Sequence, residues 1–139
     1  SGFEEPLAQL RPMLEGSSDE FQGAIDAIVT DMAGPLDGWE RQRVDRLRNA
    51  DQKVVLGIWD LVFTASAAEL DATVDALAGA ITVPYLSLHG IDPGADYGPW
   101  LRERIPSATV EVWPDLGHYP HLVEPKRFVE RVVRFDEGL

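Results

Sequence analysis

Residues 81–89, Ile-Thr-Val-Pro-Tyr-Leu-Ser-Leu-His, are the stretch that decides the fold class. The run is short, apolar and rich in β-branched and aromatic side chains, which is typical of a strand buried on both faces. Pro84 fits near the start of such a strand, where its missing N–H costs least. Because Ala78-Gly79-Ala80 separates this run from helical patterns before it, the sequence predicts a change of structure near residue 80.

Downstream of this strand the pattern predicts a β-α-β-α unit over residues 81–139. A loop rich in Gly, Pro and Asp over 90–98 precedes a short helix at 100–104, and a second strand is expected at 109–113. Pro125 suits the first position of a last helix, whose apolar face comprises Phe128, Val129, Val132, Val133 and Phe135. Two strands joined through a helix should be parallel, with a right-handed crossover. Parallel sheets normally contain more than two strands, so the sequence predicts that this sheet is incomplete. The predicted fold class is α/β.

Upstream, residues 1–80 read as a series of short helices. Leucines at helical spacing predict a first helix over 6–14. Two Ser-x-x-Glu capping boxes, Ser17 with Glu20 and Ser66 with Glu69, each open a further helix. Two more helices are expected between them, one around residues 39–47 and one over 52–63 that Asp51 can cap. The predicted organisation is therefore a helical region, 1–80, followed by the β-α-β-α region, 81–139.

Composition excludes several classes of function. The net charge of −12 argues against binding to nucleic acid or to anionic membranes, which require clustered Lys and Arg. With no cysteine, disulfides and thiolate metal sites are excluded. No apolar run approaches the roughly 20 residues that span a bilayer, and no signal peptide precedes the first helix. The start at Ser1 suggests processing or a cut, and we expect a soluble, cytoplasmic protein.

A histidine loop lies between the second strand and the last helix, Gly117-His118-Tyr119-Pro120-His121-Leu122-Val123-Glu124-Pro125. This loop resembles the histidine loop near the end of an α/β-hydrolase. Two further stretches carry the resemblance: Val83-Pro84-Tyr85-Leu86, which runs into His89-Gly90 and Asp92-Pro93, and Ile105-Pro106-Ser107-Ala108 before the next strand. The resemblance implies a partial α/β-hydrolase fold, with residues 1–80 as helical lid and 81–139 as the C-terminal part of the core. It implies His118 as the catalytic base and Asp92 as the acid that orients it.

The position of the acid leaves alternatives. The family's turn often places the acid one residue further from the glycine, where this chain has Pro93, which has no carboxylate. Asp96 is a nearby substitute. Some family members carry the acid after an earlier strand, which would make Glu4 or Glu5 candidates.

The nucleophile expected of such an enzyme is missing. Serine occurs at positions 1, 17, 18, 66, 87 and 107, never within Gly-x-Ser-x-Gly. The resemblance also places the oxyanion-hole loop in an N-terminal half that this chain lacks. We therefore expect the 139 residues alone to be inactive, and a partner segment carrying the nucleophile to complete a hydrolase for an ester, lactone or similar carbonyl substrate. C–C bond hydrolases, epoxide hydrolases and dehalogenases share the family and are not distinguished.

Four aromatic residues are candidates for an apolar substrate pocket, although each also suits an ordinary core: Trp39, Trp59, Phe63 and Trp100. Neither a metal site nor a cofactor is expected, and His89 and His121 are read as structural. The alternative function is a non-catalytic interaction protein that completes its sheet by forming a homo-oligomer. A third interpretation is a helical domain with a small β-α-β tail.

Overall fold

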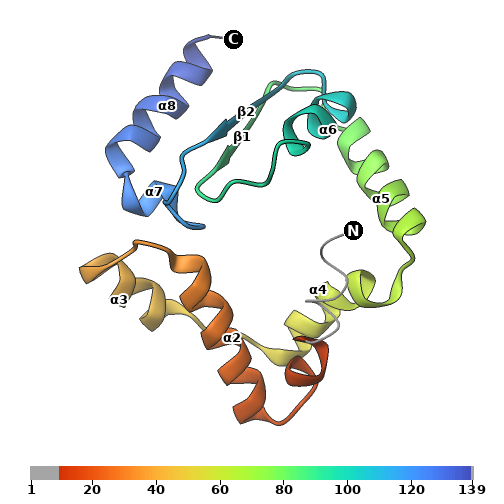
Figure 1. The fold of residues 1–139 in the computed structure, drawn as a ribbon, viewed down its shortest axis with the longest axis vertical. Coiled ribbons are helices and arrows are strands. Elements are labelled where there is room, and N and C mark those ends of the chain that lie inside the picture. The colour runs from red at the N-terminus through yellow and green to blue at the C-terminus, as the bar shows by residue number, and fades with distance from the viewer. Residues whose placement is uncertain (1–9, 139) are drawn as a thin grey trace. The chain divides into compact units, whose positions relative to one another are not determined.

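The computed structural model of the protein describes residues 10–138. Figure 1 shows the helices and strands that follow one another along this range. The elements are α2 (Ser18–Ala33), α3 (Gly38–Leu47), α4 (Gln52–Thr64), α5 (Ala67–Gly79), β1 (Tyr85–His89), α6 (Tyr97–Arg104), β2 (Ala108–Val112), α7 (Pro120–Val123) and α8 (Pro125–Glu137). Residues 10–14 are also helical, so the helix expected over 6–14 lies partly outside the described residues.

Helix dominates the structure, and this corrects the predicted fold class. Helices hold 64% of the described residues, and the strands are only two, each of five residues. The expected α/β class, with a partial α/β-hydrolase fold of helical lid and β-α-β-α unit, is therefore wrong; the fold is a mostly helical small domain. The strand expected over 81–89 pairs only from Tyr85 onward, after Pro84, which has no N–H to donate to a ladder.

The helix starts follow the capping signals in the sequence. Glu20 accepts hydrogen bonds from the backbone N–H (2.7 Å) and the hydroxyl (2.8 Å) of Ser17, which in turn accepts from the Glu20 N–H. Ser66 and Glu69 form the same reciprocal pair before α5. The Asp51 carboxylate accepts from the N–H groups of Lys53 and Val54 at the start of α4. All three predicted caps are confirmed, and each satisfies N–H groups that a helix start leaves without partners.

The chain divides into two compact units. The first combines Leu47–Thr73 with the described part of Ser1–Asp31, and the second combines Met32–Arg46 with Val74–Leu139. The predicted division at residue 80 into a lid and a core portion stays a prediction.

The core of the first unit lies between α2 and α4. Leu14, Phe21 and Ala24 are each 1% exposed. Val55, Leu56 and Phe63 of α4 pack against them, together with Leu10, Ile25 and Ala50. The Gln52 amide donates to the carbonyls of Leu14 (2.8 Å) and Gly16 (3.0 Å), so a polar side chain holds residues 14–16 against α4.

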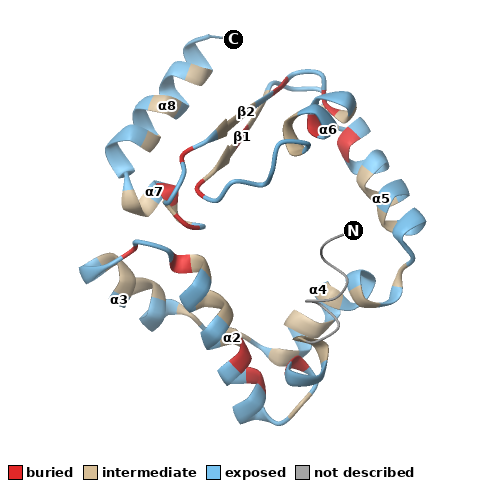
Figure 2. Cartoon of the chain, viewed as in Figure 1, coloured by how far each residue is buried: buried red, intermediate tan, exposed pale blue. Residues whose placement is uncertain are grey.

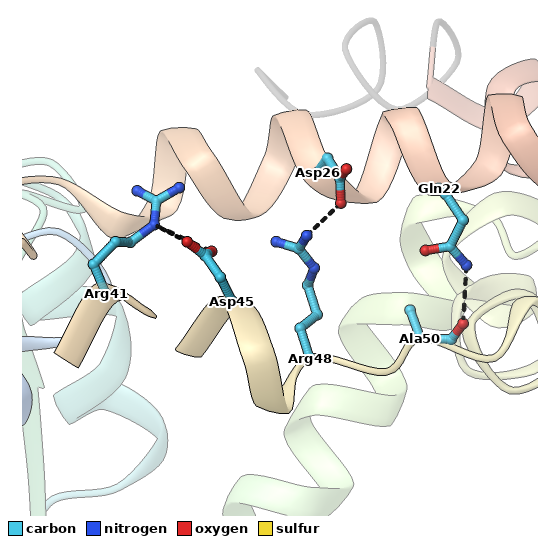
Figure 3. Close-up of polar contacts among 6 residues, drawn as sticks. All are labelled: Gln22, Asp26, Arg41, Asp45, Arg48 and Ala50. Atoms are coloured by element: carbon cyan, nitrogen blue, oxygen red, sulfur yellow. Dashed lines mark hydrogen bonds and ion pairs between the residues drawn. The ribbon is translucent and has the colours of Figure 1, made fainter. Parts of the chain in front are cut away.

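Polar contacts join α2 to the segment that precedes α4 (Figure 3). Arg48 donates to the Asp26 carboxylate, and the Gln22 amide donates to the Ala50 carbonyl at 3.4 Å. Figure 3 also shows a pair within the part of α3 that belongs to the second unit, where Arg41 donates to the Asp45 carboxylate one turn later, at 3.0 Å. Exposed ion pairs of this kind contribute little to stability, about 0–1 kcal/mol each, so the apolar core carries most of the unit's stability.

One face of α4 is apolar but exposed. Val54, Ile58, Leu61 and Val62 are between 39% and 70% exposed, while the opposite face packs on the core. A helix that is apolar around most of its circumference is normally covered on all sides. This face is therefore an apolar surface that the described residues of the first unit leave exposed.

In the second unit, β1 and β2 form a parallel pair, with Ser87 opposite Val110 and His89 opposite Val112. The expected parallel arrangement of strands joined through a helix is confirmed by this pairing (Figure 1). Leu101 and Ile105, from α6 and the residue after it, pack with Ala78 and Ala108 in the unit's main apolar cluster. This cluster covers one face of the sheet because the side chains of alternate strand residues share that face.

Two basic residues of the last helix, α8, contact β2 and the residue after it. Arg131 donates to the Glu111 carboxylate of β2, and the guanidinium of Arg127 lies 4.0 Å from the ring centroid of Trp113. Figure 2 shows that α8 is otherwise largely exposed. Val129, Val132 and Val133 are 59%, 42% and 48% exposed. The predicted apolar face therefore exists on this helix, but those three valines are not covered. Among the described residues, no helix is both long and apolar enough to span a membrane.

Candidate functional site

His118 is presented on a loop whose backbone is tightly held. Gly117 has a positive φ of 63°, a backbone conformation that residues other than glycine rarely adopt. The next N–H, that of His118, donates a 2.8 Å hydrogen bond to the Met32 carbonyl at the end of α2. The His118 side chain itself is exposed. The loop therefore offers an accessible imidazole from a backbone that has little freedom.

Three glycines allow this close approach. A Cβ on Gly117 would lie 2.7 Å from the Met32 carbonyl oxygen, and one on Gly90 would lie 2.0 Å from the Gly117 carbonyl oxygen. A Cβ on Gly34, which also has a positive φ, would lie 2.9 Å from Gly117 Cα. All three distances are shorter than real Cβ contacts, so the three backbone segments meet only because side chains are absent. We call Gly34, Gly90 and Gly117 the glycine junction.

The glycine junction places His118 at the carboxyl end of β1. The Leu116 N–H donates to the Gly90 carbonyl at 3.0 Å, and the Trp113 N–H donates to the His89 carbonyl at 2.7 Å. The carboxyl ends of parallel strands are where α/β folds commonly bind ligands, because the loops that follow the strands converge there. In this unit the loops after both strands meet in the same way.

His89 is the second imidazole at this position. Its Nε2 lies 2.7 Å from Ser87 Oγ, and Ser87 Oγ lies 3.2 Å from the Tyr97 hydroxyl. Burial, followed by electrostatic repulsion from His118, lowers the pKa of His89 below its ordinary 6.5. The two histidines are therefore close enough for their charges to interact. The sequence had suggested no chemical role for His89 or Ser87, although the i, i+2 spacing of a strand places both on one face.

The predicted acid, Asp92, lies in the loop after β1. Its side chain is exposed, and its Oδ1 accepts the Gly94 N–H at 2.8 Å, which closes a short turn. Within residues 10–138, Asp92 makes no hydrogen bond or ion pair with His118. Asp96 stands just before α6 without a side-chain cap, and Glu4 and Glu5 lie outside the described residues. The acid role of Asp92 stays a prediction.

The four predicted pocket aromatics occupy different surroundings. Trp39 is 63% exposed with Arg46 over its ring, and Trp100 stacks on Tyr97 with ring centroids 5.8 Å apart. In the first unit, Trp59 contacts Phe63 at 5.9 Å between centroids, and Phe63 packs on that unit's core. Two surface hollows in the second unit, of about 320 Å³ and 360 Å³, are lined by other residues. A substrate role for the four aromatics stays a prediction.

His121 and Ser107 have local partners. The His121 ring lies 5.7 Å from that of Phe128 and 6.2 Å from that of Tyr119, as suits a packing role. The Ser107 hydroxyl donates to the Val83 carbonyl at 3.0 Å. In the part of the chain that the structure describes, no group of three or more His, Asp or Glu side chains is arranged to hold a metal ion.

Comparison of the chain with models of protein families, with curated proteins and with solved structures finds no match in any of the three. The site is therefore interpreted from its own geometry. That geometry brings together His89, Ser87 and Tyr97, while the loop that carries His118 is bonded to Gly90 through the Leu116 N–H, and Asp92 is bonded within its own turn.

Proposed function

We propose that this chain supplies His118 as a general base to the hydrolysis of an ester, lactone or similar carbonyl compound. The observation that carries the proposal is an exposed imidazole on a loop held by the His118–Met32 hydrogen bond and the glycine junction. A general base works best when its position is set before the substrate binds, because no orientation has then to be gained during the reaction.

In this proposal the nucleophile comes from a segment outside these 139 residues. His118 takes the proton of a hydroxyl nucleophile as its oxygen attacks the substrate carbonyl, and then gives that proton to the departing alcohol. Water then attacks the acyl group while His118 takes a proton from it. His118 gives this proton back to the oxygen of the nucleophile, which is released in its original form. Asp92 is the proposed acid that would orient His118, after its carboxylate turns away from the Gly94 N–H. The 139 residues alone are expected to be inactive.

The proposed substrate is small and moderately apolar, in keeping with the exposed aromatic rings of Trp39 and Trp100 in the same unit. The reaction as proposed needs neither a metal nor a cofactor. Nucleic acids and membranes are not proposed as partners, because the net charge is −12. The cytoplasm stays the proposed location.

The test compares two histidine variants of the protein purified with whatever polypeptide accompanies it. Native mass spectrometry first identifies any second polypeptide, and hydrolysis of p-nitrophenyl butyrate is then measured. We expect His118→Ala to lower kcat/KM roughly 100- to 10,000-fold, as loss of a general base does. His121→Ala, a histidine of the same loop, is the matched control and should keep its activity. Full activity in His118→Ala would overturn the proposal.

A second candidate function is a non-catalytic interaction protein that self-associates. The observation in its favour is exposed apolar surface on α4 and α8, together with a sheet of only two strands in the described residues. Strand edges and apolar faces left open favour pairing with another chain. This alternative predicts a stable homo-oligomer without hydrolase activity, and a monodisperse monomer in sedimentation velocity would count against it.

A further inference from the structure

A chain of three polar side chains runs from α6 into β1. The Tyr97 hydroxyl lies 3.2 Å from Ser87 Oγ, and Ser87 Oγ lies 2.7 Å from His89 Nε2. Ser87 is 7% exposed, so its hydroxyl depends on these two partners rather than on water. The ring of His89 also meets that of Tyr97 edge to face, with centroids 4.8 Å apart. The imidazole is therefore held both by a hydrogen bond and by ring packing.

The chemistry of the three groups sets the direction of their hydrogen bonds. A phenol is a stronger donor and a weaker acceptor than an aliphatic hydroxyl, so Tyr97 donates to Ser87. Once Ser87 Oγ accepts from Tyr97, its single proton can be donated to His89 Nε2, and this is the direction on which the proposal below depends. Nε2 must then be unprotonated, and in a neutral imidazole the proton is carried by Nδ1. Burial and His118 both lower the pKa of His89, which favours this neutral form at pH 7.

The Nδ1 atom is open to an external partner. It has no hydrogen-bond partner among the described residues. Arg104 Nε, which is ion-paired with Asp75 without hydrogen-bond geometry, is the one buried side-chain nitrogen or oxygen of the described chain that lacks a hydrogen bond. His89 is half-buried, and its Nδ1 is not one of these fully buried atoms. It lies at the carboxyl end of β1, close enough to His118 for their charges to interact.

We propose that Ser87 and Tyr97 are positioning residues that hold His89 as a neutral imidazole, and that His89 Nδ1–H donates a hydrogen bond to the carbonyl oxygen of the substrate. The proposal rests on the proposed function, because it assigns to that site the donor that polarises the ester or lactone carbonyl. A neutral donor that is already oriented can stabilise the negative charge that develops on this oxygen during attack. His118 would act on the nucleophile while His89 binds the carbonyl.

The first test is the tautomer of His89 in the uniformly ¹⁵N-labelled chain at pH 7.5. Long-range ¹H–¹⁵N correlation spectra should show a protonated, pyrrole-type Nδ1 and an unprotonated, pyridine-type Nε2. In Ser87→Ala the imidazole loses its donor, and we expect the Nε2–H tautomer to predominate. Ser87→Thr retains a hydroxyl and should restore the wild-type signals, while Ser107→Ala is the matched control. A protonated Nε2 in the wild-type chain would overturn the proposal without any need for a variant to fold.

The second test uses γ-butyrolactone as the probe. We expect a saturable change in the His89 Nδ1 resonance of the wild-type chain, and at least tenfold weaker binding in Ser87→Ala. No change up to saturating lactone would overturn the proposed contact with a carbonyl oxygen. Neither of these two measurements depends on turnover of a substrate. Full hydrolytic activity in His118→Ala would therefore overturn the proposed function, while the tautomer and lactone measurements would still decide the role of His89.

Discussion

Ser87 Oγ lies 2.7 Å from His89 Nε2, and both side chains leave the same face of β1. The contact joins a buried hydroxyl to an imidazole whose pKa is lowered by burial and, to a smaller extent, by His118.

The ionisation of His89 should depend on His118. Burial is the larger cause of the lowered pKa of His89, and repulsion from His118 is the smaller one. Replacing His118 by Ala should therefore raise the pKa of His89 part of the way back toward 6.5. NMR titration of the His89 Cε1–H resonance measures this shift. An unchanged pKa in His118→Ala would show that the two rings are not close in solution.

The same lowered pKa has a consequence for stability. The folded chain holds the His89 proton less tightly than the unfolded chain does, so stability falls as pH decreases through 6.5. The fall should level off once pH is below the folded-state pKa, where both states bind the proton. Urea unfolding at a series of pH values measures this slope, and His89→Gln should reduce it.

A side chain at position 117 should destabilise the second unit. Gly117→Ala places a Cβ 2.7 Å from the Met32 carbonyl oxygen, at a φ of +63°. We expect a loss of roughly 2–4 kcal/mol in the free energy of unfolding, from backbone strain and steric overlap together. Gly57→Ala is the control, since no atom lies within 4 Å of the new Cβ in the middle of α4. It should stabilise the chain by about 0.5–1 kcal/mol. Thermal and urea unfolding of both variants would distinguish the two effects, and equal stabilities would contradict the glycine junction.

The core of the first unit should depend on Phe21. Its side chain is 1% exposed between α2 and α4, and Phe21→Ala should cost about 3–5 kcal/mol because it removes buried area and leaves a cavity. Ile58 is 70% exposed on the apolar face of α4. Apart from the difference in helix propensity between Ile and Ala, Ile58→Ala should change the free energy of unfolding by less than about 0.5 kcal/mol. Circular dichroism during urea unfolding measures both. A large effect of Ile58→Ala would indicate that another chain covers this face.

The capping box at Ser66 should make helix α5 sensitive to acid. Hydrogen bonds from the Ser66 hydroxyl and N–H lower the pKa of Glu69 below 4.5. The ionised Glu69 carboxylate therefore stabilises the folded chain above pH 4.5. This stabilisation is lost as pH falls through the folded-state pKa of Glu69, which is below 4.5. Glu69→Gln should remove this part of the acid dependence, measured by amide exchange in the first turn of α5. Glu103→Gln, an exposed glutamate in α6, is a control that should leave α5 unchanged.

Local signals in the sequence predicted local structure well. The Ser17, Asp51 and Ser66 caps begin helices as expected, because each cap acts within three residues of itself. The parallel pairing of β1 with β2 was also predictable, since a short helix joins them. The fold class was not predictable in this way, because it depends on how many strands pair with one another. The strand expected over 81–89 pairs only after Pro84 and is therefore shorter than the sequence pattern predicts.

The candidate site was only partly predictable. His118 was visible from its Gly-His loop, but its anchor at Met32 lies in a distant helix that no local pattern indicates. Alternation along β1 could have paired Ser87 with His89, whereas Tyr97 joins them only through the packing of α6. Asp92 was chosen by resemblance; its carboxylate accepts a hydrogen bond from the Gly94 N–H, and its role as the acid stays a prediction.

The hydrogen bond between the His118 N–H and the Met32 carbonyl has a consequence for folding kinetics. Its two ends are far apart along the chain, so it can form only after a long intervening segment has closed, at an entropic cost that local helices do not bear. The His118 amide should therefore be protected from hydrogen exchange late during refolding, after the helices have formed. That single amide reports when the proposed base first reaches its working position.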